Sequence, residues 1–302
     1  MRKQFAAWMA AHGAARHNTV FLTGDLGFMA LETVREAMGD RFLNAGVAEQ
    51  NMISLAAGLA QQGLAPFCYS IAPFIAFRPL EQIRLDICIH NQNVKLVGNG
   101  GGYGYGIMGA SHHALEDLAV LSAQPNLRCF IPFCNEDVAP VCDAMAARPG
   151  PAYLRLGFGA APAGLNLASP YAPVRQLTHG GNVTVIGLGP VLLNAFQACR
   201  QAQVAAEVFA VAEFPVTDWG PALAASLRRT GRLLIIEEHV ARGGLGEHLA
   251  LWMLQHGLSA TLEHRYALGY PQNRYGSQDY HQHASGLDIA SLQDTLRRLS
   301  HG

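Results

Sequence analysis

The sequence predicts an α/β protein of two doubly wound domains, each a mostly parallel sheet with helices on both faces. Short runs rich in β-branched residues alternate with longer Ala- and Leu-rich stretches that have helical spacing. The alternation stops once, at a proline-containing segment with little periodicity, and then resumes. The length of 302 residues also fits two domains of about 150 residues. We therefore expect a first domain at 1–160, a linker at 161–178 and a second domain at 179–302.

The expected strands are short apolar runs that end at glycine, proline or polar residues. They lie at 19–22, 41–44, 65–69, 94–97, 127–131 and 152–156 in the first domain, and at 183–187, 207–210, 233–237 and 261–266 in the second. The expected helices have apolar residues three or four positions apart. They lie at 1–15, 31–38, 49–61, 79–90, 113–122, 136–147, 191–202, 221–230 and 246–254. Helices between successive strands favour parallel sheets.

The N-terminal residues predict an internal helix rather than a targeting segment. Phe5, Trp8 and Met9 share one face of the helix at 1–15, and His12 interrupts its apolar run. No stretch of 18 uncharged apolar residues occurs, so we expect no membrane span. The six cysteines form no Cys-x-x-Cys pair, which disfavours a zinc site, and we expect no metal ligands in this chain. Without a secretory signal, the cysteines indicate a cytoplasmic protein with reduced, buried thiols.

Charge is balanced and scarce. Lys and Arg number 21 and Asp and Glu number 22, for a formal net charge of -1, which argues against a nucleic-acid-binding stripe or an acidic tail. Charged residues make up 14%, against about 25% in a typical soluble domain. Two explanations are open: part of the surface is covered by another subunit, or the core is large and Ala-rich.

A glutamate opens the helix at 49–61, directly after a glycine turn at Gly46. Backbone N–H groups and the helix dipole favour a carboxylate there, so Glu49 can be an ordinary first-turn residue. The helix carries almost no charge from Asn51 to Gly63, which instead indicates a buried setting. A buried carboxylate needs a partner that shares or holds a proton. The position of Glu49 alone allows either role.

A glycine-rich loop between Gly98 and Gly109 follows the strand at 94–97 and contains the pattern G-x-G-x-x-G. A dinucleotide-binding site would also need an acidic residue at the end of the next strand, about 20 residues later, and the chain has none there. We therefore expect a mobile loop near a ligand. His112, at its end, either caps the following helix or serves that ligand, and His113 is expected to be structural.

Three aromatic residues, Tyr69, Phe74 and Phe77, cluster around two prolines. They can be core residues. They can also form a platform for a flat heterocycle, because aromatic faces stack on rings with an offset.

Two sets of short motifs follow one another along the chain. The first set is Gly46-Val47-Ala48-Glu49-Gln50, Ala57-Gly58-Leu59-Ala60, Glu81-Gln82-Ile83-Arg84, Gly109-Ala110-Ser111-His112 with Glu116, and Pro125-Asn126-Leu127. The second set is Glu237-Glu238-His239 with Gly243-Gly244-Leu245-Gly246. The first resembles the pyrimidine-binding domain of the transketolase family, which includes 1-deoxyxylulose-5-phosphate synthase, and the second resembles the family's C-terminal domain. The resemblance covers nearly the whole chain.

The resemblance implies thiamine diphosphate as cofactor. In this family a protonated carboxyl, here Glu49, donates to N1′ of the aminopyrimidine and pushes that ring toward its imino form. Phe74, with Phe77 as second candidate, would stack on the pyrimidine. Tyr69 and Gln50 are further cofactor-binding candidates.

The resemblance also implies a substrate-facing histidine. His112 aligns with the family residue that faces a hydroxyl or carbonyl oxygen of the substrate, where it would donate a hydrogen bond or move a proton. Asp25 and Arg78 are further substrate-binding candidates. The substrate itself would be a small ketose or acyl donor.

One part of the family's machinery is missing. A separate domain of the family holds the diphosphate and its divalent metal with a Gly-Asp-Gly…Asn motif, and no Gly-Asp-Gly occurs in this chain. The resemblance therefore implies the C-terminal subunit of a split transketolase. An N-terminal partner subunit would supply the motif with Mg²⁺ or Ca²⁺, in an α2β2 heterotetramer.

The sequence departs from the family where sugar phosphates are bound. Met108 stands where an aspartate precedes the loop histidine, and Phe158 is the nearest equivalent of the arginine that grips phosphate. Phenylalanine has no hydrogen-bond donor for a phosphate. Arg155 lies on the preceding strand, and alternation would turn it to the other face from Phe158. We therefore expect a two-carbon ketol or acyl transfer on substrates other than the usual pentose phosphates.

Three alternatives fit parts of the sequence. The β chain of a 2-oxoacid dehydrogenase E1 component shares the fold and the glutamate, and would pass an acyl group to a lipoyl carrier. A non-catalytic assembly subunit could keep the fold, although the presence of Glu49 argues against it. A stand-alone nucleotide-binding protein is the third.

Overall fold

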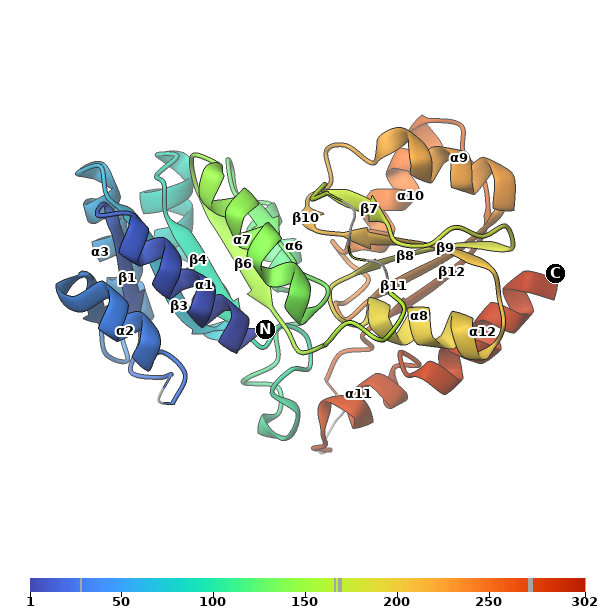
Figure 1. Cartoon of the computed structure of the whole chain (residues 1–302), viewed down its shortest axis with the longest axis horizontal. Helices are drawn as coiled ribbons and strands as arrows, with labels where there is room; N and C mark the ends of the chain where they lie inside the picture. The colour runs from blue at the N-terminus through green and yellow to red at the C-terminus, as the bar shows by residue number, and fades with distance from the viewer. Residues whose placement is uncertain (28, 166, 168–169, 271–273, 302) are drawn as a thin grey trace.

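The computed structural model describes residues 1–27, 29–165, 167, 170–270 and 274–301. It confirms the expected α/β class. Two mostly parallel sheets lie side by side, a seven-stranded one from the N-terminal half and a five-stranded one from the C-terminal half (Figure 1). In this described part of the chain, no helix combines the length and apolar character needed to cross a membrane. The six cysteines are buried and unpaired, as expected.

The first sheet has the strand order β10-β5-β6-β4-β3-β1-β2. Its parallel strands are β1 (Thr19–Thr23), β2 (Phe42–Asn44), β3 (Ala65–Ile71), β4 (Lys95–Asn99), β5 (Arg128–Phe130) and β6 (Ala152–Leu156). Residues along each strand alternate between the two faces. One face, with Phe21, Phe67 and Val97, packs under α1 (Arg2–Ala15), α2 (Glu32–Met38) and α7 (Val138–Ala147) (Figure 1). The other packs against α3 (Glu49–Gln61), α4 (Ala72–Phe77) and α6 (Asp117–Ser122).

The second sheet has the order β12-β11-β8-β9-β7. Its strands are β7 (Val174–Gln176), β8 (Val183–Leu188), β9 (Ala206–Val211), β11 (Arg232–Glu237) and β12 (Thr261–Tyr266). Leu192 of α8 (Leu192–Gln201) and Leu292 of α12 (Ile289–His301) pack on one face. Leu223 of α9 (Gly220–Thr230) and Leu249 of α10 (Leu245–Gln255) pack on the opposite face (Figure 1).

The two sheets share a strand connection and a common buried core, and are not joined by a linker alone. β10 (Glu213–Phe214) follows β9 of the second sheet but pairs antiparallel with β5 of the first. One cluster of buried side chains, including Ile131, Ile186 and Phe214, runs across both sheets. The segment 161–178, expected to be a linker, contains β7, which pairs with β9. The end of that segment is therefore an edge strand of the second sheet.

Several helices differ from the expectation. The helix expected at 79–90 is a short α5 (Leu80–Gln82) followed by a π-helix at Ile83–Ile89. The helix expected from 113 begins only at α6, because Ala114 pairs with Gly102 in an isolated bridge. α4, α11 (Gln278–Ala284) and α12 were not expected. Ser277 caps α11 by accepting a hydrogen bond from the Tyr280 N–H, a signal that the sequence does contain.

Candidate functional site

The chemistry-bearing segments gather at one edge of the first sheet. β1, β2, β3 and β4 are parallel neighbours, so their carboxyl ends lie along the same edge. In open α/β sheets, ligands bind in the crevice outside these ends. Asp25, Glu49, Phe74 and the glycine-rich loop that ends at His112 each follow one of these strands. The fold therefore places along one sheet edge residues that the sequence separates by 87 positions, from 25 to 112.

Glu49 is the first residue of α3, and its side chain is turned inward. It is 7% exposed. The preceding residue, Ala48, provides no side-chain cap, so the carboxylate at the first turn is the group that complements the positive end of the helix. Its ion-pair partner is Arg78, whose Nη1 lies 2.8 Å from Oε1 of Glu49. Of the two roles considered for Glu49, the structure favours a buried, paired carboxylate.

Arg78 joins Glu49 to the aromatic residue Phe74. Phe74 lies in α4, and Arg78 follows the end of that helix, four residues later. The guanidinium carbon of Arg78 lies 3.6 Å from the centroid of the Phe74 ring, a close cation–π contact. One planar group thus stacks on Phe74 and donates to Glu49 at the same time.

The glycine-rich loop brings His112 to the same cluster. The His112 and Phe74 ring centroids are 5.1 Å apart, and the Tyr105 centroid is 5.9 Å from that of His112. Ser111 Oγ lies 3.0 Å from Nδ1 of His112. Asn99, at the end of β4, donates from Nδ2 to the Tyr105 hydroxyl at 2.9 Å. Tyr105 and Ser111 thus lie beside His112, and Asn99 holds the Tyr105 hydroxyl. Tyr105 was not expected at the site, although a tyrosine within a glycine-rich loop is a signal that the sequence contains.

Other predicted site residues lie elsewhere. Tyr69 is buried in the core, with its ring centroid 6.0 Å from that of Phe5 and 6.2 Å from that of Phe21. It lies on the face of the first sheet that packs under α1, whereas α4, which carries Phe74, packs on the other face. Phe77 is half-buried and packs against the core beside α3. Gln50 is exposed on the first turn of α3.

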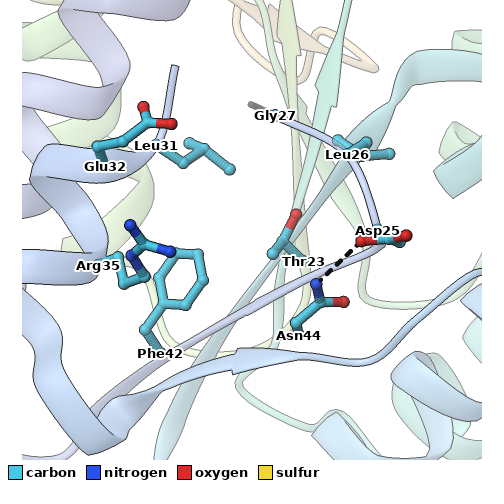
Figure 2. A pocket seen from close by; sticks show the side chains of 9 residues that line it. All are labelled: Thr23, Asp25, Leu26, Gly27, Leu31, Glu32, Arg35, Phe42 and Asn44. Atoms are coloured by element: carbon cyan, nitrogen blue, oxygen red, sulfur yellow. Dashed lines mark hydrogen bonds between the residues drawn. The ribbon is translucent and has the colours of Figure 1, made fainter. Parts of the chain in front are cut away.

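Asp25 lines a different cavity. This cavity, of about 260 Å³, lies at the carboxyl ends of β1 and β2 (Figure 2). Asn44 donates from Nδ2 to Oδ1 of Asp25 at 3.2 Å and accepts from the Gly46 N–H at 2.9 Å. Asp25 is thus connected to the turn that leads to Glu49, but lies in its own pocket.

The second sheet supports the glycine-rich loop through Glu238. This buried carboxylate accepts hydrogen bonds from the Tyr103 N–H at 2.7 Å, from Gln278 Nε2 at 2.9 Å and from Gln282. Burial raises the pKa of Glu238, while these hydrogen bonds act in the opposite direction. Gly102 has φ +67°, and a Cβ there would come within 2.3 Å of Oε1 of Glu238. The close approach of loop and carboxylate therefore requires glycine at this position.

Arg155 is committed to a buried ion pair. Its Nε donates to Oδ2 of Asp117 at 2.9 Å, and its Nη2 donates to the Ala114 carbonyl at 2.8 Å. Asp117 also accepts from the Tyr153 hydroxyl at 2.8 Å. Phe158 is exposed. Neither position offers a free guanidinium for a phosphate.

His113, expected to be structural, is buried beneath the loop. Its Nε2 lies 2.8 Å from the Gly106 carbonyl. Burial lowers the pKa of His113, which favours the neutral ring, and the Gly106 carbonyl acts in the opposite direction. The residue thus holds the loop that carries His112.

Comparison with known proteins assigns both halves of the chain to family models. The model described as transketolase, pyrimidine binding domain matches residues 1–162, and the model described as transketolase, C-terminal domain matches residues 172–290. The B subunit of apulose-4-phosphate transketolase from Phocaeicola vulgatus is 30% identical over 252 residues, which cover 81% of this chain and 80% of that protein. The 6-deoxy-6-sulfo-D-fructose transketolase subunit SqwH of Clostridium sp. strain MSTE9 is 30% identical over 234 residues, covering 75% and 72%.

A solved structure agrees with these relatives. It is described as a split gene transketolase, inactive beta4 tetramer, and superposes with a TM-score of 0.84 at 28% sequence identity. The match covers 99% of this chain and 97% of that one.

Proposed function

The chain belongs to the transketolase family, and on that premise we propose that it is one subunit of a two-chain, thiamine diphosphate-dependent transferase that moves a two-carbon ketol or acyl unit. The apulose-4-phosphate transketolase relative, which is named as a B subunit, and the split-gene structure support a separate partner chain. The partner would carry the Gly-Asp-Gly…Asn motif and hold the diphosphate with Mg²⁺ or Ca²⁺. We further propose an α2β2 assembly in the cytoplasm.

The observation that carries this proposal is the contact of Arg78 with both Glu49 and Phe74. The guanidinium is planar, carries N–H groups, stacks on Phe74 at 3.6 Å and donates to Glu49 at 2.8 Å. An aminopyrimidine ring that binds in the manner of the family needs the same two contacts, an aromatic face and a carboxyl at N1′. The Arg78 guanidinium therefore occupies the place that the aminopyrimidine would take. Glu49 and Phe74 fit the cofactor because they already hold a planar N–H donor between them.

Each residue of the cluster then has a distinct task. Thiamine diphosphate, when bound, supplies the nucleophilic carbon and the electron sink of the reaction. Glu49, which is 7% exposed, would hold the proton at N1′, and a buried carboxyl is worth more there than one in solvent. Phe74 would fix the plane of the ring by offset stacking.

His112 would act on the substrate. It lies beside Phe74 and carries a Ser111 hydroxyl at Nδ1, which leaves Nε2 free to face a substrate oxygen. There it would donate a hydrogen bond or move a proton. The buried support of the loop by Glu238 would keep His112 at the required distance.

The usual pentose phosphates of transketolases are poor candidates as substrates. Met108 and Phe158 are exposed and apolar, and Arg155 is held by Asp117. No charge at these positions would compensate a phosphate.

Ketol transfer by the assembled two-subunit enzyme tests this function. With thiamine diphosphate and Mg²⁺, we expect faster turnover of unphosphorylated ketose donors than of xylulose 5-phosphate, measured as the rate of product formation with a common aldehyde acceptor. Ordinary transketolase rates with xylulose 5-phosphate would refute the substrate assignment. Acyl transfer to lipoamide in place of ketol transfer would instead identify a component of a 2-oxoacid dehydrogenase.

Replacing Arg78 tests whether its guanidinium occupies the place of the aminopyrimidine. In Arg78→Met the guanidinium no longer competes for Glu49 and Phe74, so the enzyme should bind thiamine diphosphate more tightly. The ion pair is half-exposed, and such pairs contribute little, so the dissociation constant should fall only about two- to five-fold in titration calorimetry. Arg84→Met is the matched control, because Arg84 pairs with exposed Glu81. Weaker cofactor binding by Arg78→Met would show that the guanidinium assists the cofactor rather than replacing it.

A further inference from the structure

A large cavity in the second domain is not explained by the proposed transfer reaction. Its volume of about 630 Å³ lies within the usual range of ligand pockets, about 300–1,000 Å³. Its walls come from the segment 216–221, which leads into α9, from α9 itself and from α10, the two helices that cover one face of the second sheet (Figure 1). None of the residues that the transfer reaction is proposed to use lines this cavity.

Two tryptophans form the aromatic part of the cavity. Trp219, at the start of α9, is 6% exposed, and Trp252, in α10, is half-buried. Their ring centroids are 5.4 Å apart, so the two indoles pack against each other and hold each other in place. His256 extends the row, with its centroid 5.0 Å from that of Trp252, and its Nδ1 donates to the Trp252 carbonyl at 2.8 Å. Of the aromatic side chains, tryptophan binds cations best on its ring face.

The charge in the cavity is negative and has no counter-ion from the protein. Asp218 lines the cavity, and no ion pair of the described residues involves it. The described lining contains neither lysine nor arginine. Burial lowers the pKa of His248, another lining residue, although Glu237 and Glu247 act in the opposite direction, so its ring is neutral at neutral pH. A positive ligand would therefore meet a carboxylate without competition from a protein cation.

The helix ends around the cavity also favour a cation. α10 ends at Gln255, and Gln255 and His256 both line the cavity, so the negative end of this helix dipole lies at its wall. The positive end of α9 already has a carboxylate, because Oδ1 of Asp218 accepts from the Gly220 N–H at 2.9 Å. The next residue, Pro221, has no N–H to offer. An anion would therefore find the helix start occupied and would be repelled by Asp218.

We propose that this cavity binds a small organic cation, an ammonium compound with an apolar portion. The ammonium group lies against the Trp252 ring, and the Asp218 carboxylate compensates its charge. The apolar portion packs on Val216, Ala224 and Leu251, which also line the cavity. The site is additional to the proposed transfer reaction, because binding here requires neither thiamine diphosphate nor the partner subunit.

Binding of probes matched in shape to the purified full chain tests the proposal. Choline carries the positive charge, 3,3-dimethylbutan-1-ol has the same shape without it, and benzyltrimethylammonium adds an apolar ring. Binding is followed by titration calorimetry and by fluorescence, since Trp219 and Trp252 are two of the three tryptophans of the chain. We expect benzyltrimethylammonium to bind with a millimolar dissociation constant, choline to bind more weakly, and the neutral alcohol to bind about five-fold more weakly than choline.

Two substitutions test the two contacts. Trp252→Leu removes the ring and should weaken benzyltrimethylammonium binding about three- to ten-fold. Asp218→Asn removes the charge but keeps an oxygen that can accept from the Gly220 N–H, so α9 should still begin there, and binding should weaken about two- to five-fold. Trp8→Leu and Asp40→Asn are the matched controls, because Trp8 is also half-buried and Asp40 is also exposed, but both lie in the first domain. Both controls should bind the probe as the wild type does.

Thermal unfolding checks that each variant folds, and Asp218→Asn, at an exposed position, carries the test by itself if Trp252→Leu does not fold. Equal binding of choline and the neutral alcohol, unchanged binding by Asp218→Asn, or no binding of either cation would overturn the proposal. A changed oligomeric state of folded Trp252→Leu in light scattering would show that a second copy of the chain fills the cavity, and would overturn it as well.

Discussion

Glu49→Gln is expected to lower the transfer rate of the assembled enzyme by about 10²- to 10⁴-fold, the range typical of a general acid–base group. Glutamine keeps the shape of the side chain but cannot hold and release the proton at N1′. The Glu49 side chain is buried, so a carboxylic acid dissolved in the buffer cannot take over its role. The measurement is kcat for ketol transfer at saturating thiamine diphosphate, which separates the chemical effect from weaker cofactor binding.

Glu81→Gln is the control for this experiment. Glu81 is exposed and pairs with Arg84 at the surface, so its replacement should leave kcat unchanged. Calorimetric binding of thiamine diphosphate to Glu49→Gln shows whether the site still forms. Retention of more than a tenth of the wild-type kcat by a variant that binds the cofactor would exclude Glu49 from the chemistry.

The backbone around this site could be predicted because local signals agree with the tertiary structure. The expected helix at 49–61 and the expected strand at 152–156 match α3 and β6. Their apolar spacing and their bounding glycine and proline residues are local properties. The roles expected of Glu49 and Phe74 came instead from the resemblance to the family, because position alone left the role of Glu49 open and α4, which carries Phe74, was not expected. Family motifs added the order in which these elements occur.

The contacts between distant segments could not be predicted in this way. Position along the chain does not show that Arg78 stacks on Phe74 and pairs with Glu49. The two residues of β10 are too short a run to be recognised as a strand, and only pairing with β5 defines it. The aromatic type of Tyr69 suggested a cofactor platform, but alternation along β3 turns its ring into the core.

Asp117→Asn is expected to destabilise the chain by about 3–5 kcal/mol, the usual cost of removing one partner from a buried ion pair. Asp117 is fully buried and Arg155 is 3% exposed, so the substitution leaves the guanidinium charge without its ion-pair partner in a buried site. Asparagine can still accept a hydrogen bond from Tyr153, so the loss isolates the charge. The measurement is the denaturant midpoint of the purified chain.

An exposed pair and a double variant separate charge from packing. Asp294→Asn breaks an ion pair with Arg297 at the surface and should change stability by less than about 1 kcal/mol. Combining Asp117→Asn with Arg155→Met removes both buried charges, so the double variant should be more stable than Asp117→Asn alone. If the double variant is instead less stable, the hydrogen bonds from Arg155 to the Ala114 and Glu238 carbonyls contribute more than the charge, and the arginine is retained to fasten the His112 loop to the second domain.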